Sequence, residues 1–593
     1  MVLKSTGAES VRWNLEDLYA TDKDLTADLE LAETQAAEFG KDYRSTVAGL
    51  EPHELAKALE GFESIHDRLG RAYTYAYLQW VTDTENANCG ALLQSVRETY
   101  TRIAQELIFF ELEWARAPDE VAVRVLEAEE VIRYRHYLQL LRLRERHMLS
   151  ESEERVITEM EVTGRSAWNR YFDETMASIR FDLDGERVTE QEVLSKLHEP
   201  DRELRERAAI SFTDGLKKNI RTLTYVSNTL LADKSTADRL RRYDGWLSSR
   251  NQSNEVDDDT VRALVAAVTD RYDLVARFYE LKRTLLGLDE LFDHDRYAPV
   301  GEADTRYLWQ EARDVVIDSY ASFLPRFGEI ATCFFENRWI DAAVVEGKRG
   351  GAFSHGAVPS THPYILMNFT GRIRDVQTLA HELGHGIHQY LARSQGLLHA
   401  DTPLTTAETA SVFGEMLVFH RLMAAEESPA NRLSMLVGKI DDTIATVFRQ
   451  IAMNRYEEAV HTERRSKGEL STDRFCELWL ETQRAMFQGS VSLGEHYRYW
   501  WSYIPHFHHT PGYVYAYAFG ELLVLALHEI YLEEGEAFAS GYERLLEAGG
   551  SDWPHVLVGK LGVDLKDHTF WQRGLASIER LVGEAERLAS SLA

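Results

Sequence analysis

The chain has few cysteines, and their number and spacing argue against a disulfide framework. Only three of its 593 residues are cysteines, Cys89, Cys333 and Cys476, and they lie far apart in the sequence. Disulfides persist mainly in oxidising compartments. Because the first stretch, "MVLKSTGAESVRWNLEDLY", also has no apolar segment typical of a secretion signal, we expect a reducing compartment, the cytoplasm.

Proline and uninterrupted hydrophobic runs are also scarce. The chain has 12 prolines and no low-complexity tract, which argues against a string of modules on flexible linkers. Its most apolar late stretch, residues 514–532, is interrupted by Glu521, His528 and Glu529. We therefore expect a buried helix there and no membrane span.

Positive charge is in deficit, with 66 basic against 97 acidic residues and a formal net charge of -31. A nucleic-acid partner is not expected, because such binding requires a basic face that displaces counterions. The simplest interpretation is an acidic surface that keeps the protein soluble. A preference for basic peptides is a hypothesis that the same charge allows.

Helical periodicity rich in Glu, Arg, Leu and Ala runs almost unbroken from about residue 23 to 180, which predicts an antiparallel helical assembly. Its aromatic stripe is more typical of core or groove packing than of a cofactor site: Tyr73, Tyr75, Tyr77 and Trp80. Residues 181–200 predict a short hairpin followed by a capped helix. We therefore predict an N-terminal helical domain over 1–190 and a second domain over 191–593.

Residues 338–371 are the least helical part of the chain. Gly350, Gly351 and Gly356 interrupt this segment, and "PYILMNF", which includes Tyr364, has the apolar composition of a strand. A helix then follows from Asp375 to about residue 393. The prediction is a mainly α fold with a small antiparallel sheet beside that helix.

That helix carries "HELGH", with His381 and His385 four residues apart. On an α-helix both imidazoles lie on one face and can reach one metal ion at about 2.0–2.1 Å. Glu382 lies on the neighbouring flank, where it can act as a general base toward a water molecule on the metal. Gly384 costs about 1 kcal/mol of helix propensity relative to alanine, which suggests that another segment approaches its backbone closely.

A catalytic zinc ion usually has three protein ligands and one open position. A second predicted helix, residues 405–425, offers Glu408 as the third ligand of a single zinc ion. Glu415 lies two turns further on the same face and can accept a hydrogen bond from a ligand histidine. The alternative for Glu408 is a surface acid favoured by the helix dipole, and the histidine pair makes the ligand role preferable.

Amide hydrolysis at such a metal also needs a donor for the developing oxyanion. The tract from 500 to 520, with Pro511 and Gly512 forming a loop before a helix, supplies several candidates. They are His506, His508, His509, Tyr513, Tyr515 and Tyr517.

Five blocks resemble, in order, the signature segments of oligoendopeptidase F and the wider thimet oligopeptidase-like zinc metallopeptidases. They are "KRGGAFSHG", "HPYILMNF", "DVQTLAHELGHGIH", "AETASVFGE" and "IPHF…YVYAYAFG". The similarity in the first 200 residues is looser and rests on helical character and "WNLEDLY".

The resemblance implies a helical ellipsoid with a deep cavity that admits short unstructured peptides. It implies zinc on His381, His385 and Glu408, with Glu382 as the base. Asp375 and Glu415 would support the ligands. Gly350, Gly351 and Tyr364 would bind the substrate backbone as an added strand.

The resemblance also implies that His506 and a tyrosine, either Tyr513 or Tyr517, hold the oxyanion. The segment "FHHTPG" is about one residue longer than in the family, so both tyrosines remain candidates.

We therefore predict a zinc endopeptidase of short oligopeptides, with residues 191–593 as its catalytic domain. A dipeptidyl carboxypeptidase or a metallocarboxypeptidase could use the same fold and site. A helical scaffold with a structural metal is the alternative of another class, and it is disfavoured because structural zinc sites usually contain thiolates and all three cysteines lie far from the histidine pair in sequence.

Overall fold

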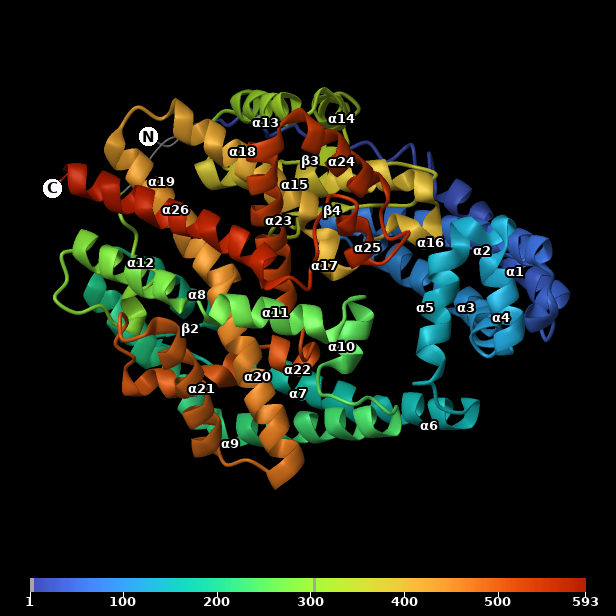
Figure 1. Ribbon diagram of the computed structural model, residues 1–593, viewed down its shortest axis with the longest axis horizontal. Helices are drawn as coiled ribbons and strands as arrows, with labels where there is room; N and C mark the ends of the chain where they lie inside the picture. Colours follow the sequence, from blue (N-terminus) through green and yellow to red (C-terminus); the bar gives the residue numbers. More distant parts are fainter. Residues whose placement is uncertain (1–4, 302–305, 593) are drawn as a thin grey trace. The chain divides into compact units, whose positions relative to one another are not determined.

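The computed structural model describes residues 5–301 and 306–592, which form helices and two small sheets (Figure 1). This confirms the mainly α class. The apolar stretch near residue 520 is α23 (Tyr515–Glu534), and its residues from Leu522 to Leu527 are fully buried. None of the helices in the described ranges has the length and apolar character needed to cross a membrane.

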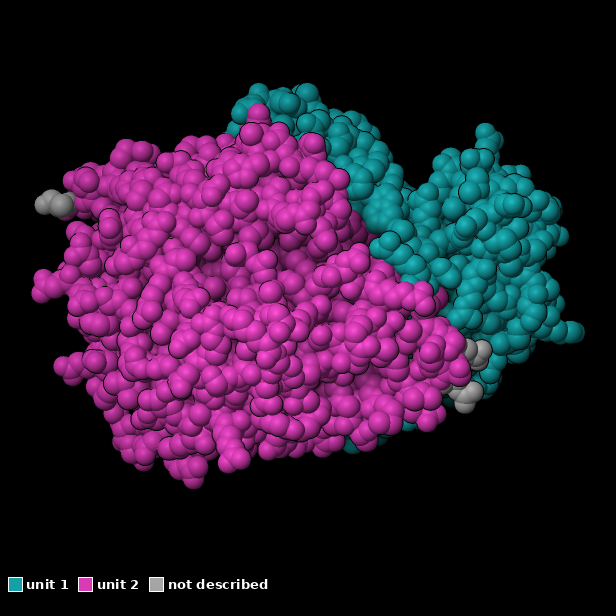
Figure 2. All heavy atoms as spheres, turned by 60° about the horizontal axis from the view of Figure 1, so that its bottom comes forward, with its two compact units in different colours: residues 1–146, 304–422, 530–563 teal, residues 147–303, 423–529, 564–593 magenta. Residues whose placement is uncertain are grey.

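The chain folds into two compact units, each assembled from three separate segments (Figure 2). Unit 1 consists of residues 1–146, 304–422 and 530–563, and unit 2 of residues 147–303, 423–529 and 564–593. The boundary predicted near residue 190 lies inside unit 2. The division into an N-terminal and a catalytic domain therefore remains a prediction from the sequence.

Unit 1 begins with five antiparallel helices whose ends carry clear signals. In α2, for example, Pro52 occupies the first turn, and Glu51 and Glu54 form a reciprocal capping box. Phe62 and Phe110 stack at 5.2 Å in the core between these helices. The five helices are α1 (Asp22–Tyr43), α2 (Pro52–Thr82), α3 (Ala87–Ala115), α4 (Asp119–Glu127) and α5 (Arg135–Glu145).

The rest of unit 1 contains a three-stranded sheet with the order β3–β5–β4. β4 (Phe353–His355) pairs with β5 (Tyr364–Leu366) in antiparallel orientation, but β3 (Ile340–Asp341) pairs with β5 in parallel. The prediction of an antiparallel sheet is thus wrong for one of its two pairings, because β3 and β5 are joined by a long crossover through the glycine segment rather than by a hairpin.

Unit 1 has other helices, and the one from Ile373 to Ala392 packs against β4 and β5. They are α13 (Trp309–Phe323), α14 (Pro325–Glu336), α15 (Ile373–Ala392), α16 (Leu397–Ala400), α17 (Leu404–Ala407), α18 (Thr409–Ala425), α24 (Glu536–Glu547) and α25 (Pro554–Gly559). The last three residues of α18 belong to unit 2.

Unit 2 is built around the long helix α9 (Arg202–Leu240), whose start is capped by the side chain of Asp201. Its buried face packs with residues 453–514 in one apolar core. The predicted hairpin is present as β1 (Phe181–Leu183) and β2 (Glu186–Val188).

The other helices of unit 2 are α6 (Glu151–Glu161), α7 (Arg165–Ser178), α8 (Glu190–Ser195), α10 (Ser248–Ser253), α11 (Asp258–Thr269), α12 (Tyr272–Leu285), α19 (Pro429–Thr446), α20 (Phe448–Lys467), α21 (Thr472–Phe487), α22 (His506–His509), most of α23 and α26 (His568–Leu592). All three cysteines of the chain are free thiols, as predicted.

Candidate metal centre and active site

Helix α15 carries the histidine pair and runs from Ile373 to Ala392, two residues earlier at its start than predicted. His381 and His385 lie one turn apart with their ring centroids at 4.9 Å. Both rings are partly exposed, at 29% and 19% of their side-chain surface. The pair therefore presents two imidazoles toward one accessible point.

Gly384, between the two histidines, is the place where a second helix approaches α15. A Cβ atom at this position would lie 2.3 Å from the carbonyl oxygen of Ala410 and 2.5 Å from the Cα of Ser411. No other residue type allows two backbones to come so close. The close approach expected from the sequence is thus present, and it brings the start of α18 to the histidine pair.

Glu408 stands in the turn between α17 and α18, where the prediction had a continuous helix from 405 to 425. Its backbone angles, φ -81° and ψ -1°, depart from the helical ψ near -42°. The Oε2 atom of Glu408 lies 3.4 Å from the Nε2 atoms of both His381 and His385. Ser411 donates a hydrogen bond of 2.6 Å to the same oxygen.

These spacings fit a zinc ion. At zinc–ligand distances of about 2.0–2.2 Å, two ligand atoms of a tetrahedron are about 3.3–3.6 Å apart. All three ligand atoms lie within 4.8 Å of one another. Two imidazoles and one carboxylate with a side open to solvent form the donor set typical of a catalytic zinc site.

The charges of this cluster are strongly coupled. Burial disfavours the charged form of Glu408, but the neighbouring histidines and Ser411 lower its pKa to about 2. Burial likewise opposes the imidazolium of His381, yet Glu415, Glu408 and Glu382 raise its pKa to about 9. A divalent cation would replace this imidazolium charge, because histidine binds metals in its neutral form.

Glu415, predicted to support a ligand, faces the other nitrogen of His381. Its Oε2 atom lies 3.6 Å from the Nδ1 atom of His381. A carboxylate on this side favours a proton on Nδ1 and leaves Nε2 free to bind a metal.

Glu382 is 7% exposed and lies on the side of α15 that contacts β4. Burial raises its pKa, while the two histidines and a backbone hydrogen bond from Ser354 of β4 partly oppose the rise. A carboxylate with a raised pKa is a stronger proton acceptor than an exposed one, as a general base requires.

Asp375 does not take the place predicted for it beside the ligands. Its Oδ2 atom accepts hydrogen bonds from the backbone and hydroxyl of Thr370, both at 2.7 Å, and from the backbone of Arg372 at 3.0 Å. Six residues of helix, about 9 Å, separate it from His381. Asp375 therefore fixes the start of α15, and the expectation of direct support for a ligand is corrected.

The glycine segment forms an exposed turn next to β4. Gly351 has a φ of +82°, which favours glycine, and a Cβ atom at Gly350 or Gly351 would meet no atom within 4 Å. The side chain of Asn368 holds this turn by donating to the carbonyl oxygens of Arg349 and Gly351 at 3.1 and 3.0 Å. The turn thus leaves room for a peptide backbone.

Tyr364, predicted to bind substrate, is fully buried. Its ring lies 6.0 Å from Trp13 and 4.4 Å from His362, within the core of unit 1. Its strand β5 is also the central strand of the sheet, so its backbone already has partners on both sides. Within the described ranges β3 and β4 are the two edge strands of this sheet, and β4 is the one that lies beside α15 and the glycine turn.

Tyr77 of the aromatic stripe lies beside this edge, which the sequence did not reveal. Its ring lies 5.8 Å from Phe353 and 5.7 Å from His355, both in β4, and its hydroxyl accepts a hydrogen bond from Arg349. Part of the stripe therefore packs at the glycine turn.

The predicted oxyanion donors form a cluster in unit 2. His506 stacks with Tyr513 at 6.1 Å and lies within 3.3 Å of the Tyr517 hydroxyl through its Nε2 atom. Tyr513 and Tyr517 are half-buried. Tyr515 instead points into the core, where its hydroxyl bonds Asn251 and Asn254.

The neighbouring histidines are engaged elsewhere. His508 is buried and bonds Ser227 at 2.9 Å, and His509 pairs with Asp173 at 2.8 Å. The structure therefore brings His506, Tyr513 and Tyr517 together.

Two tyrosines that were not predicted from the sequence form hydrogen bonds to α15 and α18, the helices at the candidate metal centre. The hydroxyl of Tyr320 donates to the carbonyl of Ala380 in α15 at 2.7 Å, and that of Tyr542 donates to the carbonyl of Thr409 at 2.7 Å. Tyr320 fits here because residue 414 is a glycine: a Cβ atom at that position would overlap the tyrosine hydroxyl. A glycine inside a predicted helix was the available signal of this close packing.

A histidine pair on one helix together with a carboxylate from a second segment is the ligand set expected of a metallopeptidase. The sequence model of "Peptidase family M3" matches residues 195–577, and the model "Oligopeptidase F" matches residues 113–181. The chain belongs to peptidase family M3, within the oligoendopeptidase F group, and is a metallopeptidase.

Similar proteins cover almost the whole chain. Oligopeptidase PepF of Bacillus subtilis is 29% identical over 588 residues, covering 97% of this chain and 87% of the relative. An oligoendopeptidase F homolog of Lactococcus lactis is 24% identical, covering 98% and 97%.

Solved structures share the fold. A peptidase structure from Chlamydophila abortus superposes with a TM-score of 0.87 at 24% identity, covering 97% of this chain and 98% of that one. Oligoendopeptidase-F from Enterococcus faecium gives a TM-score of 0.71 at 22% identity, with coverage of 96% and 99%.

Proposed function

We propose that this protein is a zinc-dependent endopeptidase that hydrolyses internal bonds of short oligopeptides. One zinc ion would be held by His381, His385 and Glu408. The observation that carries the proposal is the position of Glu408, whose carboxylate oxygen lies 3.4 Å from the Nε2 atoms of both histidines. Ser411 holds the same carboxylate oxygen by a 2.6 Å hydrogen bond, so Glu408 is fixed toward the histidines rather than turned to solvent.

A bound zinc ion would lower the pKa of a water molecule to about 7 and polarise a carbonyl group. Glu382 supplies the proton transfers. Its carboxylate, raised in pKa by burial, would take the proton from the attacking water and later deliver it to the leaving amine. Glu415 would keep His381 in the tautomer that binds through Nε2.

Substrate binding is proposed at the free edge of β4 and the exposed turn at Gly350 and Gly351. A peptide that adds to a strand edge is bound through its backbone, so recognition depends little on its side chains. His506 with Tyr513 or Tyr517 is proposed to stabilise the oxyanion, supported by the half-buried positions of both tyrosines. The deep cavity implied by the family resemblance stays a prediction, as does a cytoplasmic location, with which the free cysteines agree.

Glu382→Gln is the decisive variant, because glutamine has nearly the same shape but cannot act as a base. We expect its zinc content to equal that of the wild type while kcat falls by about 100- to 10,000-fold. Zinc would be measured by mass spectrometry of the purified protein and turnover with internally quenched peptides. Full turnover by Glu382→Gln would remove the proposed mechanism.

Peptides blocked at both ends test the endopeptidase assignment. An endopeptidase cleaves them, whereas a dipeptidyl carboxypeptidase or a metallocarboxypeptidase requires a free C-terminus. Zinc binding without cleavage of any peptide would instead favour a scaffold with a structural metal.

A further inference from the structure

A second group of potential metal ligands lies in unit 2 and has no part in the proposed reaction. Within the described residues, two sets of histidine and carboxylate side chains bring three ligand atoms within 4.8 Å of one another: the set in α15 and Glu408, and a set formed by Asp293, His294 and His496. Asp293 and His294 belong to the 3-10 turn η4 (Asp293–Asp295), and His496 to the 3-10 helix η6 (Glu495–Tyr503).

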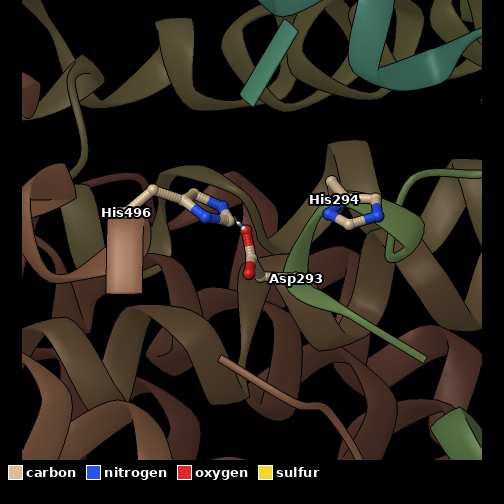
Figure 3. Close-up of side chains that lie close together, drawn as sticks. All are labelled: Asp293, His294 and His496. Atoms are coloured by element: carbon tan, nitrogen blue, oxygen red, sulfur yellow. Dashed lines mark hydrogen bonds and ion pairs between the residues drawn. The ribbon is translucent and has the colours of Figure 1, made fainter. Parts of the chain in front are cut away.

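The carboxylate of Asp293 is the centre of this set. It is fully buried, and its Oδ2 atom lies 2.7 Å from the Nε2 atom of His496. Its Oδ1 atom accepts the backbone N–H of Gly494 at 2.9 Å. Figure 3 shows the Asp293 carboxylate between the two imidazole rings, with one ring nitrogen of His294 turned toward it.

The position of His294 is not explained by the pairing of Asp293 with His496. The residue is 4% exposed, and its Nδ1 atom is buried without a hydrogen-bond partner. Its Nε2 atom lies 3.8 Å from the carboxylate of Asp295, on the other edge of the ring. A buried nitrogen without a partner is unfavourable, and a bond to a metal ion would offset this cost.

The nearby arginine side chains do not bind the carboxylate of Asp293. Arg202 and Arg205 both bond the carboxylate of Asp295, at distances near 2.9 Å. Arg296 donates through its Nε atom to the backbone carbonyl of Asp293. The carboxylate oxygens of Asp293 are therefore left to His496 and one backbone amide.

Access from solvent comes through His496, whose side chain is 18% exposed. Two imidazoles and one carboxylate suit zinc, cobalt and similar borderline ions rather than calcium or magnesium, which prefer oxygen ligands. Metal entry would displace the proton that His496 shares with Asp293 and widen their 2.7 Å contact to about 3.3 Å, the separation of two ligands on one zinc ion.

We propose that Asp293, His294 and His496 form a second site for a zinc-class divalent cation, separate from the one in α15. The ion would join η4 to η6 across 203 residues of sequence and stabilise unit 2, because a ligand that binds only the folded state shifts the unfolding equilibrium. Water would complete the coordination sphere.

Zinc content of four full-length proteins tests this proposal. We expect two ions per chain in the wild type, one in His385→Ala, one in His496→Gln and none in the double variant. Loss of zinc in His496→Gln but not in His385→Ala would support the second site and remove the proposed catalytic one. No loss of zinc on the His496→Gln substitution, in either background, would overturn the second site.

Thermal unfolding separates metal binding from a folding defect. In the His385→Ala background, added Zn²⁺ should raise the unfolding midpoint by a few degrees, and Co²⁺ should give visible d–d absorption. Both effects should disappear on adding Asp293→Asn, which preserves the acceptor for Gly494 and the side-chain volume. Persistence of both effects in this variant would also contradict the site.

Discussion

The glycine between the two histidines gives the sharpest test of how the metal centre is assembled. In Gly384→Ala the new methyl group would meet the carbonyl oxygen of Ala410 at 2.3 Å, whereas ordinary contact begins at 3.4 Å. The obstacle is backbone, which cannot rotate away as a side chain can. The two helices must therefore separate by about 1 Å at this point.

The size of the effect follows from two opposing terms. Alanine improves helix propensity by about 1 kcal/mol, and overpacking costs about 1–3 kcal/mol. We expect a net loss of up to about 2 kcal/mol in the free energy of unfolding. A shift of about 1 Å also exceeds the tolerance of about 0.2 Å in metal–ligand distance. Because Glu408 lies two residues before Ala410, zinc affinity should fall by about 100-fold or more.

Two other glycines are matched controls. A Cβ atom at Gly438, inside α19, would meet nothing within 4 Å, so Gly438→Ala should raise stability by up to about 1 kcal/mol and keep zinc. At Gly386, in the same helix as Gly384, it would meet the ring of the buried Phe334 at 2.6 Å, so the obstacle there is a side chain rather than backbone.

Zinc affinity would be measured by competition with a chelator, stability by urea unfolding, and turnover with end-blocked peptides. If Gly384→Ala matched Gly438→Ala in all three measurements, the close approach of α18 would not be what holds Glu408 in place.

Three further predictions use other contacts. Ser411→Ala removes the 2.6 Å hydrogen bond to Glu408 and should lower zinc affinity by about 10-fold with little loss of stability, as chelator competition would show. Tyr517→Phe should reduce kcat at nearly unchanged stability. Tyr515 is buried, so Tyr515→Phe should lose about 1–3 kcal/mol of stability and keep kcat. The reverse pattern would exclude Tyr517 as the oxyanion donor. Burial raises the pKa of Glu457 to about 8, so between about pH 5 and 8 the folded protein binds a proton that the unfolded chain does not. The free energy of unfolding should therefore fall as pH rises through this range. Glu457→Gln should show a smaller fall, and identical pH profiles of the two proteins would contradict the raised pKa.

The sequence by itself determined the local chemistry of the metal centre. An i, i+4 spacing on a helix fixes where two imidazoles point, whatever the rest of the chain does. The hairpin at 181–188 and the helix of the histidine pair were likewise predictable, because caps, turns and periodicity act over a few residues.

Tertiary structure decided which distant groups meet. Asp375 had the right residue type for a supporting carboxylate, but its position at the helix start directs it to Thr370. Tyr364 lies in a strand as predicted, yet packing against Trp13 buries its ring.

The two groups of candidate metal ligands also differ in how much of each can be predicted from the sequence. The histidine spacing in α15 is visible in the sequence, but the position of Glu408 depends on two helices meeting at Gly384. Asp293 and His496 are separated by 203 residues, and no periodicity links them. Local geometry is encoded in neighbouring residues, whereas the convergence of distant side chains depends on how the whole core packs.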